Sequence, residues 1–255
     1  PPLTTHEVMQ PNMYRGPFAD DANPGRAYAA DVESVVGRLV TEGRPPAAFI
    51  AESLMGTAGQ IVHPAEYLSQ AFAYVRSAGG LCISDEVQVG FGRLGHRFWG
   101  FELGDVVPDI VTMGKPMGNG HPIAAVVTTR AIADTFDTGM KYFNTFGGNP
   151  VSCAIAGAVL DVIEDERLRA HASTVGNHLV TRLHRLAEIH PTIGNVRGRG
   201  LFIGVELVED AGSRAPATAL TSRVIERIRQ HGVLVSSDGP HANVLKIKPP
   251  LVISA

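Results

Sequence analysis

The chain has 255 residues and a formal net charge of −3; 44% of its residues are hydrophobic and 18% are charged. This composition is typical of a globular protein with a large core, and without Lys- or Arg-rich blocks it does not favour a nucleic-acid partner. The apolar stretches are of strand length and are interrupted by charges or glycines, so we predict no membrane span.

Cysteine and histidine usage indicates neither disulfide nor metal chemistry. Cys82 and Cys153 both lie in apolar surroundings, so we predict two buried core thiols and a cytoplasmic, reducing location. The ten histidines lack ligand spacing, and we predict no metal site. The chain begins with Pro1 rather than Met and no signal peptide is visible, so we expect an excerpt of a longer polypeptide.

Short apolar runs alternate with amphipathic segments in the first 150 residues. After an irregular lead-in, apolar residues with a 3.6-residue period predict a helix over 32–40, and Pro64 opens a second helix that ends at Gly79-Gly80. Strands are predicted over 47–51, 81–84, 110–113 and 123–128. This alternation predicts an α/β fold with a mostly parallel sheet covered by helices on both faces.

The pattern changes after Pro150. A long helical region extends to about Glu188, with Gly176 as the expected interruption. A strand over 201–207, a helix over 220–231 and strands over 233–236 and 244–248 follow. We therefore divide the chain into residues 1–150, part of a large domain, and residues 151–255, connecting helices with a smaller α+β C-terminal domain.

Three ionisable residues follow predicted strands of the first sheet. Glu52, Asp85 and Lys115 each stand at the carboxyl end of a strand, where parallel sheets bind ligands. A buried Asp can keep a pyridinium nitrogen protonated, and a partly desolvated Lys can form a Schiff base with an aldehyde. Together they favour a site for pyridoxal phosphate, although an Asp or Lys at such a position can also simply solvate a loop.

Ordered motifs around these residues resemble a known family. They are Asp85-Glu86-Val87, Gly90-Phe91-Gly92-Arg93-Leu94-Gly95, Asp109-Ile110-Val111, Gly114-Lys115 and Phe143-Asn144-Thr145-Phe146-Gly147-Gly148-Asn149-Pro150. The chain from about Tyr14 to Leu251 resembles the class III aminotransferases, pyridoxal-phosphate enzymes of fold type I. The resemblance implies an incomplete large domain of a pyridoxal-phosphate-dependent transferase.

The resemblance also implies residue roles. Lys115 would form the internal aldimine and move the substrate proton, and Asp85 would pair with the pyridinium nitrogen. Val87 would pack on the ring, and Gln88 would hydrogen-bond its phenolic oxygen. Thr145 would donate to the cofactor phosphate of the neighbouring subunit, which implies a homodimer with shared sites.

Two departures from the family pattern bear on the substrate. After the first sheet glutamate, Glu52, many relatives have a second glutamate where this chain has Thr57, and Lys246 stands where a carboxylate-binding arginine is usual. Lysine lacks the bidentate fork with which arginine binds a carboxylate. The combination resembles the phospho-lyases of O-phosphoethanolamine and 5-phosphohydroxylysine. Glu52, Thr57 and Lys246 are the candidate substrate residues. Lys246 or Lys248 would recognise phosphate, unless both are strand residues that face solvent or a structural carboxylate.

Three functions follow from the sequence. The favoured one is a phospho-lyase that releases phosphate, ammonia and an aldehyde from a small O-phosphorylated primary amine. The first alternative is a transaminase that moves an amino group from an ω-amine or amino acid to a keto acid. The second is a non-catalytic fragment that contributes fold and dimer surface, because the small-residue phosphate cup and stacking aromatic of the relatives are not found upstream of Lys115.

Overall fold

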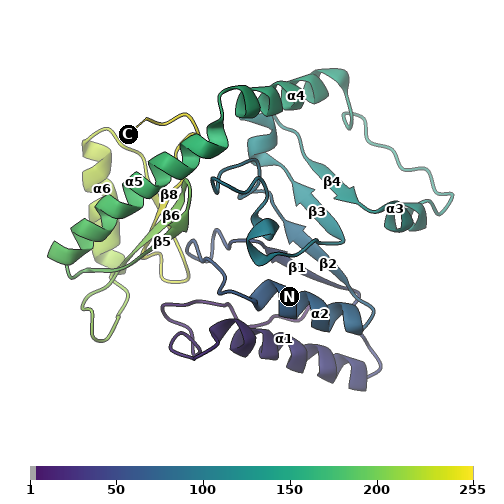
Figure 1. Cartoon of the computed structure of the whole chain (residues 1–255), viewed down its shortest axis with the longest axis horizontal. Coiled ribbons are helices and arrows are strands. Elements are labelled where there is room, and N and C mark those ends of the chain that lie inside the picture. Colours follow the sequence, from purple (N-terminus) through teal and green to yellow (C-terminus); the bar gives the residue numbers. More distant parts are fainter. Residues whose placement is uncertain (1–3, 255) are drawn as a thin grey trace.

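The computed structural model describes residues 4–254, which form two sheets linked by a pair of long helices (Figure 1). The first sheet contains β1 (Ala48–Glu52), β2 (Leu81–Asp85), β3 (Ile110–Met113) and β4 (Ala125–Thr128) in that order. Strands β1, β2 and β3 are parallel, and β4 pairs antiparallel with β3. The predicted α/β class with a mostly parallel sheet is therefore confirmed.

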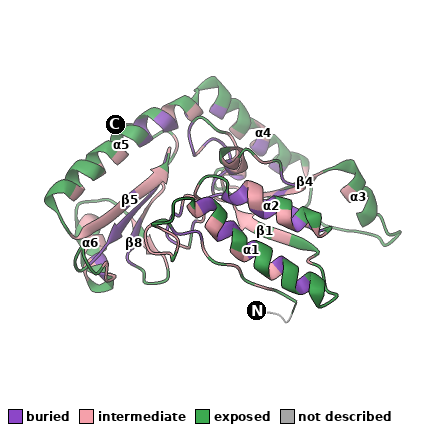
Figure 2. Cartoon of the chain, turned by 60° about the horizontal axis from the view of Figure 1, so that its bottom comes forward, coloured by how far each residue is buried: buried purple, intermediate pink, exposed green. Residues whose placement is uncertain are grey.

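Helices α1 (Pro24–Thr41) and α2 (Tyr67–Ser77) pack against each other and supply the main core of this half. α1 begins well before the predicted residue 32 because Asn23 caps it: its side-chain oxygen accepts a hydrogen bond from the Arg26 N–H at 3.3 Å. Tyr28 of α1 and Phe72 of α2 are almost fully buried. In Figure 2 buried residues recur along both helices.

Helices α1 and α2 cover one face of the first sheet. Cys82 of β2 packs in the cluster formed by α1 and α2, and strand alternation then puts Ile83 on the opposite face. Ile83 is the register partner of both Ile50 and Ile110, so the three isoleucines share that face. Ile50 is 61% exposed, so this face is open along β1.

Three shorter helical elements complete this half of the chain. They are the 3₁₀ helices η1 (Gly100–Gly104) and η2 (Lys115–Gly118) and the α-helix α3 (Arg130–Phe136). α3 has no buried residues, which explains why its sequence carries no amphipathic pattern. The exposed segment 137–149 leads from it to the next helix.

The long helical region is divided at a different residue than predicted. α4 (Pro150–Asp165) and α5 (Leu168–Ile189) are separated at Arg167, whose φ of +52° is left-handed. Gly176 instead lies inside α5, where an added Cβ would come within 2.1 Å of the Gly200 carbonyl oxygen. This glycine therefore permits close packing rather than a break. Cys153 on α4 is exposed, so its predicted burial was wrong.

The second sheet is antiparallel throughout. Its order is β5-β6-β8-β7, formed by β5 (Ile193–Arg199), β6 (Phe202–Leu207), β8 (Val244–Ile247) and β7 (Ser236–Asp238). α5 and α6 (Thr218–Gln230) pack on it. β5 was not predicted as a strand, because four of its seven residues are glycine or arginine. The domain boundary near residue 150 stays a prediction.

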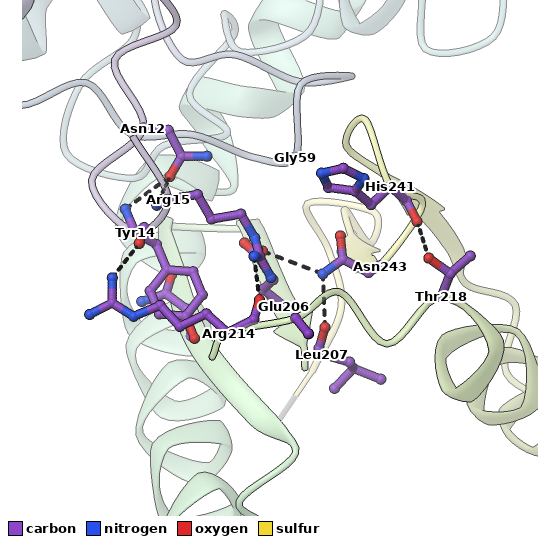
Figure 3. Close-up of polar contacts among 12 residues, drawn as sticks. Asn12, Tyr14, Arg15, Gly59, Glu206, Leu207, Arg214, Thr218, His241 and Asn243 are labelled. Carbon is purple, nitrogen blue, oxygen red and sulfur yellow. Dashed lines mark hydrogen bonds and ion pairs between the residues drawn. The ribbon is translucent and has the colours of Figure 1, made fainter. Parts of the chain in front are cut away.

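Buried polar contacts join the two halves (Figure 3). Glu206 on β6 forms ion pairs with Arg15 and, at 2.7 Å, with Arg197 Nη1. Nε of Arg197 also donates to the Gly59 carbonyl oxygen at 2.9 Å. Arg93 in turn donates to the Pro249 carbonyl oxygen at 2.8 Å. These contacts hold β5 against the loop that follows β1, and the chain after β8 against the loop that follows β2.

Among residues 4–254, no helix combines the length and apolar character needed to cross a membrane.

Candidate active site

The site begins as a row of side chains on the open face of the first sheet. Glu52, Asp85 and Thr112 are successive register partners at the ends of β1, β2 and β3. Each lies two residues after one of the three isoleucines, so strand alternation gives these side chains the same face. The predicted meeting of Glu52 and Asp85 at one sheet edge is therefore present.

Asp85 is held by the turn that follows β2. One of its carboxylate oxygens accepts a hydrogen bond from the Val87 N–H at 2.9 Å. Val87 lies beside the next strand end, since a Cβ added at Gly114 would be 3.8 Å from Val87 Cγ1. Asp85, Val87 and Gly114 therefore lie close together. Among residues 4–254 the second carboxylate oxygen of Asp85 accepts no hydrogen bond, so it is available to a ligand.

Lys115 directly follows β3 and opens η2. Its φ of +31° is in the left-handed region, which is costly for a residue with a Cβ and which clusters at functional sites. The chain has only four lysines, Lys115, Lys141, Lys246 and Lys248. Lys141 lies in the exposed segment before α4, whereas Lys246 donates to Asp238 and Lys248 donates to Gln88. Of the four lysines, Lys115 is the one that directly follows a strand of the first sheet.

The pKa of Glu52 depends on the charged groups around this row of side chains. Burial raises the pKa of this carboxyl, the Gly56 N–H hydrogen bond opposes the rise, and the Asp85 charge adds to it. The charges of Lys248 and Lys115 lower the same pKa. Two carboxylates and two ammonium groups from distant parts of the sequence therefore act on one another here.

Gln88 connects the row to the second half of the chain. Its side-chain oxygen accepts a hydrogen bond from Lys248 Nζ at 2.9 Å, across 160 positions of sequence. Gly56 leaves room for this amide, because an added Cβ would lie 2.8 Å from Gln88 Nε2 and 3.0 Å from Glu52 Oε2. The ammonium of Lys248 also lies 4.4 Å from the centroid of the Phe202 ring.

The two lysines after β7 differ in their partners. Lys246 Nζ forms an ion pair with Asp238 at 3.0 Å, and Asp238 also accepts a hydrogen bond from Gln60. Lys248 has no carboxylate within ion-pair distance in the described part of the chain, and burial lowers its pKa to about 8. The contact between Lys248 and Gln88 was not predicted, because it depends on how the two sheets are placed.

Two other candidate residues lie outside this group of contacts. Thr57 is exposed, and its carbonyl oxygen accepts a hydrogen bond from the Gly239 N–H at 2.9 Å. Thr145 lies in the exposed segment before α4, with Phe143 83% exposed and Phe146 81% exposed on either side. Their roles toward substrate and neighbouring subunit stay predictions.

Glu86, next to Asp85, is fully buried and supports the site from behind. Its carboxylate accepts hydrogen bonds from the Ser53 and Ser84 hydroxyls and from the Gly100 and Phe101 N–H groups. Burial raises the pKa of Glu86, and these donors lower it. The residue therefore fixes the end of β2 against the start of η1.

These residues fit pyridoxal phosphate by the chemistry of their donors and by their placement. Asp85 offers a carboxylate oxygen on the open sheet face, Gln88 an amide, and Lys115 an exposed amine at the adjacent strand end. Within residues 4–254, no cluster of three or more His, Cys, Asp and Glu side chains is arranged to hold a metal. The arrangement suits an organic cofactor with a protonatable ring nitrogen and an aldehyde.

Comparisons with known proteins agree with this chemistry. A family model described as Aminotransferase class-III matches residues 4–255. "Alanine--glyoxylate aminotransferase 2-like" of Drosophila melanogaster is 51% identical over 98% of this chain and 52% of its own length. "Ethanolamine-phosphate phospho-lyase homolog 1" of Caenorhabditis elegans is 45% identical over 98% of this chain and 56% of its own length. The chain spans about half the length of these curated relatives.

A solved structure is similar throughout the chain. It is a phospholyase from Arthrobacter in complex with phosphoethanolamine, 44% identical, with a TM-score of 0.92. The match covers 98% of this chain and 59% of that one.

Proposed function

Because the chain belongs to the class III aminotransferase family, we propose that it forms the lysine-bearing part of a pyridoxal-phosphate-dependent active site that acts on a small primary amine. The favoured reaction is elimination of phosphate from an O-phosphorylated amine, after which water hydrolyses the enamine product to ammonia and an aldehyde. The observation that carries this choice is the pair Lys246 and Lys248. It brings two ammonium groups to the site, and among residues 4–254 Asp238 is the one carboxylate that forms an ion pair with either of them. The ammonium of Lys248, which forms no ion pair in the described part of the chain, suits a phosphate oxygen.

Each residue of the row has a proposed task. When bound, pyridoxal phosphate supplies an electron sink for the carbon next to the amine nitrogen. Asp85 would keep the proton on the ring nitrogen, Val87 would pack on the ring and Gln88 would donate to its phenolic oxygen. Lys115 would hold the cofactor through Nζ and would supply the base for the proton on the substrate carbon.

The substrate residues are proposed from charge. Lys246 and Lys248 attract the phosphate, while Thr57 cannot repel it as a second glutamate would. Glu52 remains beside Asp85 and is the candidate partner for the substrate amine. The similarity to the phospholyase in complex with phosphoethanolamine supports this class of substrate.

The proposal includes a homodimer. The exposed segment 137–149 carries Met140, Tyr142, Phe143 and Phe146, all more than 70% exposed, around Thr145. Such a patch is typical of an interface, and Thr145 would reach the cofactor phosphate of the neighbouring subunit. The cytoplasmic location stays a prediction, and the relatives from Arabidopsis thaliana and Homo sapiens are named mitochondrial.

Transamination is the second candidate, favoured by the 51% identity to the Drosophila melanogaster relative named as an aminotransferase. The two reactions use the same cofactor and the same lysine. They differ in whether phosphate leaves or the nitrogen stays on the cofactor.

Product analysis separates the candidates. The complete polypeptide, as encoded, is loaded with pyridoxal phosphate and given O-phosphoethanolamine, and phosphate, ammonia and aminated cofactor are measured together. Equal amounts of phosphate and ammonia without aminated cofactor are expected. Aminated cofactor without phosphate would instead support the transaminase. A protein that takes up no cofactor would support the non-catalytic fragment.

A further inference from the structure

The contact between Lys248 and Gln88 determines which end of the Gln88 amide is free to bind a ligand. A glutamine amide can present either its oxygen or its NH₂ group to a ligand, because the two ends have nearly the same shape. Lys248 Nζ donates to the Gln88 oxygen at 2.9 Å. An ammonium has only donors, so it can bind only the oxygen end of the amide.

The surroundings of Lys248 hold this ammonium in place. Nζ lies 4.4 Å from the centroid of the Phe202 ring, a residue with no exposed surface. Lys248 follows β8, and the Arg93 hydrogen bond to the Pro249 carbonyl oxygen ties this segment to the loop after β2. The charged groups around it are Asp238 of β7, Lys246 of β8, Glu52 of β1 and Arg93.

We propose that Lys248 is a positioning residue for Gln88: it occupies the amide oxygen and thereby leaves the NH₂ group of Gln88 as the donor to the phenolic oxygen of the bound cofactor. The inference rests on the proposed function and adds a residue to it. Lys246, two residues earlier, has no such task, because Asp238 binds its ammonium. Burial lowers the Lys248 pKa to about 8, so its charge is retained at neutral pH and decreases in mildly alkaline solution.

The visible absorbance of the bound cofactor reports this arrangement independently of turnover. Its pH dependence follows the proton on the nitrogen that joins the cofactor to Lys115. A donor to the phenolic oxygen and a nearby positive charge both disfavour that proton. Lys248→Met is therefore expected to raise the midpoint of the titration by about half a pH unit or more. Lys248→Arg keeps charge and donors and is expected to restore most of the wild-type midpoint.

The decisive comparison is a double-mutant cycle in the complete, cofactor-loaded polypeptide. Lys248→Met is measured in the wild-type and in the Gln88→Ala background, with Lys246→Met as the matched control. Lys248→Met is expected to shift the midpoint clearly more in the wild type than with Gln88→Ala, and Lys246→Met is expected to shift it little. Equal shifts in both backgrounds would overturn the positioning role while leaving the proposed function intact.

A thermal unfolding scan of each variant separates loss of folding from loss of positioning. If Lys248→Met unfolds, Lys248→Gln, which keeps a side-chain donor without the charge, replaces it in the cycle. If the wild-type protein shows no cofactor absorbance that depends on Lys115, the proposed function itself fails and this inference fails with it.

Discussion

Glu52 and Asp85 are register partners at the carboxyl ends of β1 and β2, so two carboxylates lie side by side on the open face of the sheet. The Asp85 charge is one of the causes that raise the pKa of Glu52. Like charges at this spacing favour a cationic ligand between or above them. A protonated ring nitrogen over Asp85 and a substrate amine near Glu52 would satisfy both.

Asp85→Ala is expected to lower turnover by about a hundredfold or more, because the ring nitrogen loses the charge that keeps it protonated. Cofactor attachment through Lys115 is expected to persist. Steady-state kinetics and cofactor absorbance measure the two effects. Asp161→Ala on the exposed surface of α4 is the matched control and should behave as wild type. Wild-type turnover in Asp85→Ala would refute the role of Asp85.

Gly56→Ala tests the space that Gln88 needs. The new methyl group would lie 2.8 Å from Gln88 Nε2, so the amide must move away from its present position. We expect weaker cofactor binding, by about tenfold, measured by fluorescence titration. Gly37→Ala is the control, because no atom lies within 4 Å of the added Cβ inside α1, and it should instead stabilise the protein by about 1 kcal/mol.

The lowered pKa of Lys248 predicts that the free energy of unfolding depends on pH. Its pKa is about 8 in the folded chain and 10.5 for the unperturbed side chain, so the unfolded chain binds the proton more tightly. Stability from this group therefore increases as the pH rises from about 8 to 10.5. Urea unfolding of wild type and Lys248→Met at neutral and alkaline pH measures the difference. The wild type should gain relative to the variant, and parallel curves would contradict the shifted pKa.

Glu86→Leu is expected to destabilise the fold by about 3 kcal/mol, because the Gly100 and Phe101 N–H groups and the Ser53 hydroxyl would lose their buried acceptor. Denaturant unfolding measures this loss. Glu86→Gln keeps the shape and one oxygen, so its effect should be smaller. Equal stability of Glu86→Leu and wild type would show that other groups satisfy these donors.

The local hydrophobic pattern was enough to predict the row of residues at the ends of β1, β2 and β3. Apolar runs of strand length predicted β1, β2 and β3, and parallel pairing then brought Glu52, Asp85 and Lys115 to one edge. The break between α4 and α5 was misplaced because Arg167 carries no glycine or proline signal for its left-handed backbone. Glycine at 176 suggested a break, whereas its actual contact is with distant backbone.

The contact between Lys248 and Gln88 could not be predicted from sequence in this way. The two residues are 160 positions apart and belong to different halves of the chain. Their approach depends on Arg93, Arg197 and Glu206, whose buried contacts join those halves. The hydrophobic periodicity of the sequence does not indicate such a contact, because it depends on how the two sheets lie relative to each other.

The roles proposed for the other site residues all depend on attachment of the cofactor to Lys115. The complete polypeptide is loaded with pyridoxal phosphate, reduced with borohydride and digested, and the peptides are examined by mass spectrometry. We expect one modified lysine, Lys115, with Lys141, Lys246 and Lys248 unmodified. A reduced cofactor on one of those three lysines, or on none of the four, would contradict this expectation.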